Sequence, residues 1–192
     1  MDMKLFLLLL FLLYASFNAS ADCGDSPDLL GARYELSFAR PDETEHVVKE
    51  LVLWRNQQQV AIEYVDTGVT DVWEMARSGK LRVVRNFDEA KRAIEYQPFD
   101  LNSGRGDTDW SSKRQLIPDG LFSRMELVGS EGEGCEKVER YRLEEGGRKL
   151  ELAWMPERQL VKSLSEQGSR GTETWRLQDI VDGRQVLADR AH

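Results

Sequence analysis

The stretch that decides the fold runs from residue 46 to residue 87 and reads HVVKELVLWRNQQQVAIEYVDTGVTDVWEMARSGKLRVVRNF. Apolar and polar residues alternate along it, so that Val60, Ile62 and Tyr64 share one face of an extended chain, a period of two that is typical of strands. Short polar groups interrupt this pattern as the turns of β-hairpins do, at residues 56–58, 67–68 and 78–79. The segment therefore predicts strands joined by tight turns.

The same pattern continues on both sides of this stretch. Residues 31–40, GARYELSFAR, predict a strand before it. After it, residues 88–98 allow either a short helix capped by Asp88 or a turn followed by a strand that ends at Pro98, and we favour the strand. The second half of the chain predicts further strands at residues 136–145, 148–157, 158–167, 172–180 and 184–190.

Two segments depart from the strand pattern. Residues 102–113, NSGRGDTDWSSK, lack periodicity and predict a surface loop. Residues 114–129 predict a helix, with Pro118 near its start and Gly129 just past its end. Nine or ten short strands with one or two helices predict a mainly β (α+β) fold, a curved antiparallel sheet or an incomplete β-barrel.

The N-terminal residues 1–21, MDMKLFLLLLFLLYASFNASA, have the features of a secretory signal peptide. Lys4 precedes the apolar run Leu5–Leu13, and small residues end the segment before Asp22. The run is shorter than the roughly 20 residues of a membrane-spanning helix, so we expect cleavage and no stable transmembrane anchor, with an uncleaved anchor as the alternative. The expected mature protein is periplasmic or secreted, with one β-rich domain at residues 22–192.

The two cysteines outside the leader, Cys23 and Cys135, predict a disulfide bond in such a compartment. Asp22 stands directly before Cys23, where a lipidation site requires a small residue, so a lipid anchor is not expected. The formal net charge is −8, and acidic and basic residues are mixed along the chain. Nucleic-acid partners are therefore not expected, because they require clustered Lys and Arg.

Candidate catalytic groups are sparse. The two histidines, His46 and His192, do not stand in a metal-ligand spacing, and no serine lies in a GxSxG motif. Carboxylate residues are abundant, but the sequence does not indicate which two would converge on a cleft, as glycoside hydrolysis requires. The sequence therefore predicts no catalytic residue, no metal site, no cofactor and no enzymatic activity.

Aromatic residues inside the predicted strands are the candidate ligand-binding residues. An indole or phenol ring serves equally well in a packed core or in the wall of an apolar pocket, and strand periodicity alone does not separate the two. The candidates are Trp54, Tyr64, Trp73, Tyr96, Trp154 and Trp175.

Three segments, at residues 69–101, 141–167 and 172–180, together with the leader, resemble in layout the superfamily of the periplasmic lipoprotein carrier LolA and its outer-membrane receptor LolB. The resemblance implies an incomplete antiparallel β-barrel whose helices cover an apolar interior that holds lipid chains. It assigns no role to an individual residue.

These observations predict an exported, non-enzymatic binding protein for a hydrophobic ligand such as a lipid or a lipoprotein acyl chain. The alternative is a protein–protein interaction or assembly module of the cell envelope, with another envelope protein as its partner.

Overall fold

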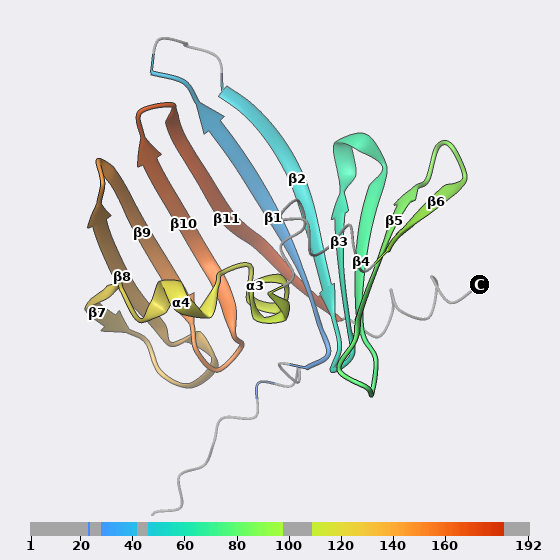
Figure 1. Cartoon of the computed structure of the whole chain (residues 1–192). Coiled ribbons are helices and arrows are strands. Elements are labelled where there is room, and N and C mark those ends of the chain that lie inside the picture. Colours follow the sequence, from blue (N-terminus) through green and yellow to red (C-terminus); the bar gives the residue numbers. More distant parts are fainter. Residues whose placement is uncertain (1–22, 24–27, 42–45, 98–108, 183–192) are drawn as a thin grey trace, which may run out of the picture.

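The computed structural model describes residues 23, 28–41, 46–97 and 109–182. In this part of the chain the strands form one curved antiparallel sheet (Figure 1). Its eleven strands follow the order β6-β5-β4-β3-β2-β1-β11-β10-β9-β8-β7, so the sheet is open and has β6 and β7 at its edges. The predicted mainly β, curved antiparallel fold is confirmed.

The first six strands follow one another across half of the sheet. They are β1 (Leu30–Ala39), β2 (His46–Arg55), β3 (Gln59–Tyr64), β4 (Val69–Met75), β5 (Leu81–Phe87) and β6 (Arg92–Tyr96). The turn between β2 and β3 forms because the side-chain oxygen of Asn56 accepts the backbone N–H groups of Gln58 and Gln59, at 2.8 and 2.7 Å. The strand predicted before Pro98 is confirmed as β6.

Two short helices cross from one half of the sheet to the other. In α3 (Trp110–Gln115), the Asp109 carboxylate caps the first turn by accepting the N–H of Ser111 at 3.0 Å, and Leu116, with φ of +61°, ends the helix. The second helix is α4 (Asp119–Phe122), which Pro118 precedes.

Two predictions for this region are wrong in their extent. Residues 110–113 of the predicted surface loop are helical, and residues 98–108 lie outside the described part. The helix predicted at 114–129 is interrupted, because a proline disfavours the helical conformation in the residue before it, and residues 126–131 form a strand. Pairing of that strand with β8 overrides its local pattern.

The remaining strands return towards β1. They are β7 (Glu126–Glu131), β8 (Val138–Glu145), β9 (Arg148–Met155), β10 (Leu160–Gly168) and β11 (Gly171–Asp182), with a short 3-10 turn, η3 (Gly134–Glu136), before β8. β11 pairs with both β10 and β1, so Trp175 lies between Leu164 and Leu36 and joins the two halves of the sheet. The predicted strand at 184–190 and the leader lie outside the described residues.

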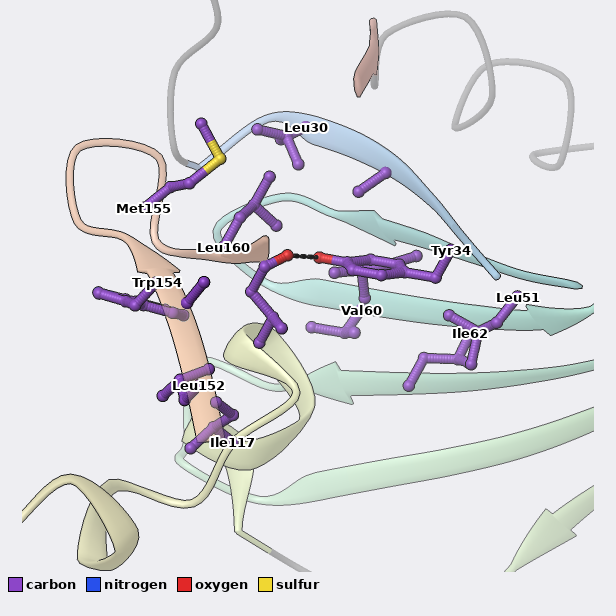
Figure 2. Close-up of a cluster of buried hydrophobic side chains, with 14 of the residues drawn as sticks. Leu30, Tyr34, Leu51, Val60, Ile62, Ile117, Leu152, Trp154, Met155 and Leu160 are labelled. Carbon is purple, nitrogen blue, oxygen red and sulfur yellow. Dashed lines mark hydrogen bonds between the residues drawn. The ribbon is translucent and has the colours of Figure 1, made fainter. Parts of the chain in front are cut away.

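We call the face against which α3 and α4 pack the inner face. The main buried cluster lies there, and Figure 2 shows strand residues such as Leu30, Val60 and Leu160 pointing into it, with Ile117 from the connection between the helices. The Tyr34 hydroxyl, also in this cluster, donates a hydrogen bond to the backbone oxygen of Val161 at 3.0 Å (Figure 2). The inner face therefore carries the core.

The predicted disulfide bond between Cys23 and Cys135 is confirmed. It joins the segment before β1 to η3, across 112 positions of the sequence. Disulfides persist in oxidising compartments, which favours an extracytoplasmic location. Among the helices of the described residues, none has the length and apolar character required to span a membrane.

Candidate functional site

One end of the inner face is tightly packed; we call it the packed end. Arg55, at the end of β2, is fully buried and donates hydrogen bonds to the backbone oxygens of Arg114 at 2.6 Å, Gln159 at 2.8 Å and Arg158 at 2.5 Å. Burial lowers the pKa of Arg55 to about 10. This side chain therefore fastens the end of α3 to β2 and to the turn between β9 and β10.

The same end is reinforced by two other arginines. Arg114 donates to the backbone oxygen of Asn56 at 2.6 Å and to the Asp28 carboxylate at 2.7 Å. The Arg158 Nε group donates to the backbone oxygen of Cys135 at 3.3 Å, which links this network to the disulfide-bonded turn. Helix, sheet and disulfide are thus held together at the packed end.

Further along the inner face lies a groove between α3 and the strands, with a cavity volume of about 220 Å³. Its strand side is apolar apart from one phenol, and its other side comes from α3 and the connection to α4. The strand residues are Leu36, Leu51, Ile62, Tyr64 and Trp175, and the residues on the other side are Ser112, Lys113, Leu116 and Pro118. Leu36, Tyr64 and Trp175 are only half-buried, so the groove is not filled by its own side chains.

Lys113 is the one charged side chain among the described residues that line the groove. Its Nζ atom lies 5.2 Å from the centroid of the Trp73 ring, within the range of a cation–π contact. The opposite wall contributes Tyr64, whose pKa is raised by burial and then by the nearby Asp71 carboxylate. The phenol therefore stays neutral at ordinary pH.

An ion pair lies beside the groove on β4 and β5. Asp71 pairs in register with Ile62, which places it on the inner face, and its side chain is 5% exposed. Arg85 donates to both Asp71 carboxylate oxygens at 2.6 Å and lies 5.9 Å from the centroid of the Tyr96 ring. The hydrogen bond to Asp71 raises the pKa of Arg85 further, so the guanidinium stays charged at neutral pH.

Sequence reasoning missed this pair, although a signal was present. Asp71 stands in phase with Trp73 on β4, and Arg85 stands in phase with Val83 on β5, so a period of two places both charges on an apolar face. A buried charge on an apolar face requires a partner of opposite charge. The partner of Asp71 is Arg85, which lies opposite it on the neighbouring strand.

Two of the six predicted ligand-binding aromatics, Tyr64 and Trp175, line the groove. The indole N–H of Trp175 donates to Glu173 at 2.6 Å, and the ring packs edge-on against Tyr34 with centroids 6.4 Å apart. Glu173 also lines a more polar hollow of about 430 Å³ beyond the groove, together with Phe38 and Arg170. The Trp175 side chain therefore lies at the boundary between an apolar and a polar region.

The other four aromatics lie elsewhere. Trp73 and Trp154 are each 7% exposed and belong to the main buried cluster. Trp54 lies on the opposite face of the sheet, in a small cluster with Val52 and Ala61. Tyr96 is half-buried and lies at the edge of the sheet. The structure thus does not bring the six residues together at one site.

The lining residues from α3 could not be found from the sequence, because a helix of six residues in a polar segment gives no clear periodic signal. In the described part of the chain, no group of three or more His, Cys, Asp or Glu residues lies close enough to hold a metal ion. The arrangement of an apolar wall, one cation and one phenol provides contacts for binding.

Comparisons with known proteins give structural similarity only. No family model and no curated protein matches the sequence. Similar solved structures include a DUF1329 family protein from Desulfovibrio piger ATCC 29098, with 6% identity, a TM-score of 0.39 and coverage of 81% of this chain and 85% of that one. An outer membrane lipoprotein-sorting protein domain from Vibrio parahaemolyticus has 8% identity, a TM-score of 0.37 and coverage of 81% and 86%.

A third similar structure is PNGF-II, with 6% identity and a TM-score of 0.40. The match covers 81% of this chain and 28% of that one. At these identities and TM-scores the similarity carries no argument about function, which depends on the groove itself.

Proposed function

We propose that this protein is an exported, non-enzymatic binding protein that holds a hydrophobic molecule, such as a lipid or an acyl chain, in the groove of the inner face. The observation that carries the proposal is that Leu36, Tyr64 and Trp175 are left half-buried around a cavity, on the same face where neighbouring apolar residues are fully packed. Ligand sites are typically concave and mostly apolar, with a few polar groups, and the groove has this composition.

The volume of the groove supports a slender ligand. At about 220 Å³ it lies below the roughly 300–1,000 Å³ that is typical of pockets for drug-sized molecules. A single alkyl chain fits this limit better than a bulky ring system. Burial of each methylene contributes about 0.8 kcal/mol, so a chain of medium length gains measurable affinity from apolar contact alone.

Calorimetric titration of delipidated protein with dodecanoate tests this proposal. Leu36→Phe places a larger side chain in the groove, and we expect it to weaken dodecanoate binding. Leu127→Phe is the matched control, because Leu127 is 54% exposed on edge strand β7. Trp175→Phe identifies the source of any change in tryptophan fluorescence. Absence of heat and of spectral change for alkyl chains of every length tried would overturn the proposal.

The proposal includes export through the leader at residues 1–21 to the periplasm or the exterior, with residues 22–192 as the mature domain. The disulfide bond supports this part, since it requires an oxidising compartment. Intact mass and N-terminal sequencing of the protein from its native host should give a chain that begins at Asp22. A chain that retains Met1 would overturn it.

A second candidate function is that of an interaction module of the cell envelope. The observation that favours it is edge strand β7, where the adjacent residues Leu127 and Val128 are 54% and 48% exposed. An exposed strand edge with apolar side chains can accept a strand from a partner. Leu127→Lys should then remove a co-purifying envelope protein without changing dodecanoate binding, and the opposite pattern would contradict this function.

A further inference from the structure

We propose that the groove and the polar hollow beyond it form one site for an amphiphile with a zwitterionic head group, whose anionic part meets Arg170 and whose cationic part meets Glu173. This inference rests on the proposed function and names the class of ligand for the same site. It starts from the hollow, which has a volume of about 430 Å³ and is lined by side chains of both charges.

The hollow continues the groove along strands β1 and β11. At the groove, Leu36 pairs in register with Trp175. The next pair in the same inward phase is Phe38 with Glu173, and both residues line the hollow. Two residues of a strand span roughly 7 Å, so the hollow begins where the apolar wall of the groove ends. The turn between β10 and β11, which carries Arg170, lies at the end of the sheet that the described helices leave uncovered (Figure 1). The head group of an alkyl chain in the groove therefore reaches the hollow.

Four charged side chains line the hollow, and two of them already form an ion pair. Arg148 donates to Oε1 of Glu166 from its Nε and Nη2 groups, at 2.9 and 2.5 Å. In the described part of the chain, the one hydrogen bond that the Glu173 carboxylate accepts comes from a neutral donor, the indole N–H of Trp175, at 2.6 Å. The Arg170 side chain forms neither an ion pair nor a hydrogen bond with another described residue. The hollow thus contains one carboxylate and one guanidinium that no ion pair compensates.

The register of β10 and β11 favours a cationic group beside Glu173. Glu166 and Glu173 stand directly opposite each other on these strands, and like charges in this arrangement repel. Arg148 compensates Glu166, so a cationic group of a ligand next to Glu173 relieves the remaining repulsion. Phe38 pairs with Glu173 from the other side and adds an aromatic ring to the lining, which favours a quaternary ammonium group.

Arg170 is the complementary group for the anionic part of the head. A guanidinium is planar and donates two parallel hydrogen bonds to a phosphate or a carboxylate. Because two arginines and two glutamates line the hollow, their formal charges cancel. A head group of one sign would satisfy only one of the two uncompensated residues and would lie near a charge of its own sign. A head group with one anionic and one cationic part satisfies both.

The experiment compares twelve-carbon chains that differ only in the head group. We expect dodecylphosphocholine to bind about tenfold more tightly than dodecanol, because two exposed ion pairs each contribute only a few-fold in affinity. Dodecyl phosphate and dodecyltrimethylammonium, which each form one of the two contacts, should lie between them. The measurement is calorimetry at pH 8 and low salt, below the micelle concentration of each ligand. The differences should decrease as the salt concentration rises.

Glu173→Gln tests the contact with the cationic part. Glutamine keeps a side-chain oxygen that accepts the Trp175 indole N–H but removes the charge. We expect dodecylphosphocholine and dodecyltrimethylammonium to lose affinity several-fold, whereas dodecanol affinity should stay unchanged. Glu126→Gln, at an exposed position of edge strand β7, is the matched control and should have no effect.

Arg170→Met tests the contact with the anionic part. We expect this variant to lose affinity for dodecylphosphocholine and dodecyl phosphate several-fold, and not to lose affinity for dodecyltrimethylammonium. Arg77→Met is the matched control, because Arg77 is exposed in the turn between β4 and β5. The two variants should therefore change the order of the ligands in opposite ways.

The proposed function and the head-group inference fail in different ways. If none of the four chains binds, the proposed function is overturned and the head-group inference with it. If the chains bind but dodecylphosphocholine binds no more tightly than dodecanol, or if neither variant changes the order of the ligands, only the head-group inference is overturned. Glu173 and Arg170 are both exposed, so we expect the variants to fold. The series on the unsubstituted protein tests the inference even if a variant folds poorly.

Discussion

The packed end of the inner face and the groove are built from the same strands, yet their side chains have different exposure. At the packed end Leu160 and Val161 are fully buried, and Arg55 is buried with them. Around the groove, Leu36 and Trp175 are half-buried, although Leu36 stands on β1 in the same inward phase as the fully buried Tyr34. Strand pattern therefore does not decide which part becomes core.

The difference in side-chain exposure depends on which segments of the chain cover each part of the inner face. α3 and α4 lie across one part of the sheet, and the described helices leave the opposite strand ends uncovered (Figure 1). The hydrogen bonds of Arg55, Arg114 and Arg158 hold the cover at the packed end. A single sheet face can therefore contain both a packed core and an open groove.

The largest expected effect comes from removal of the disulfide bond that closes the packed end. For a loop of about a hundred residues, the chain-entropy model assigns a stabilisation of about 4 to 5 kcal/mol. We expect Cys23→Ser with Cys135→Ser to lower the free energy of unfolding by up to this amount in urea denaturation. A midpoint equal to that of the unsubstituted oxidised protein would show that the bond does not stabilise this end.

The next effect tests the buried arginine. Arg55→Met removes the donor for three backbone oxygens, and we expect the free energy of unfolding to fall by about 3 kcal/mol, because hydrogen bonds to charged groups contribute roughly 1.5–3 kcal/mol each and are not additive. Arg33→Met is the control, since Arg33 pairs with Glu50 at the surface and should cost less than about 1 kcal/mol. Equal losses for both variants would contradict the special role of Arg55.

A matched pair of leucines compares the two regions directly. Leu160 is 0% exposed, so Leu160→Ala should lower the free energy of unfolding by about 2–5 kcal/mol. Leu36 is half-buried beside the groove, so Leu36→Ala should cost about 1 kcal/mol and should instead weaken alkyl-chain binding. The comparison fails if Leu36→Ala is as destabilising as Leu160→Ala.

The smallest effect concerns Tyr34, which lies between the two regions. Burial raises the pKa of Tyr34 above the ordinary value of 10. The stabilisation that comes from burying the neutral phenol is therefore fully present below pH 10. Above pH 10 the phenol ionises in the unfolded chain, and the free energy of unfolding falls by about 1 kcal/mol per pH unit. Tyr34→Phe should lose about 1 kcal/mol at pH 7 with its hydrogen bond to Val161.

Urea denaturation between pH 7 and pH 11 measures this difference. The stability of Tyr34→Phe should decline less steeply above pH 10 than that of the unsubstituted protein, because phenylalanine does not ionise. Parallel declines would assign the alkaline loss to other groups.

The sequence by itself determined most of the strands and the disulfide. Period-two stretches such as residues 60–64, with turn residues such as Asn56, favour β-hairpins through local backbone and side-chain preferences. The chain contains two cysteines, so each has one possible partner, which made the pairing predictable. These features depend on residues that are close in sequence or few in number.

Only the tertiary structure decided that residues 126–131 form an edge strand and which aromatics line the groove. Trp154 and Trp175 occur in similar strands, but the first packs against Phe122 of α4 and the second lies beside the cavity. The physical reason is that burial depends on which distant segment covers a strand face. Alternation along a strand specifies the face but not its cover.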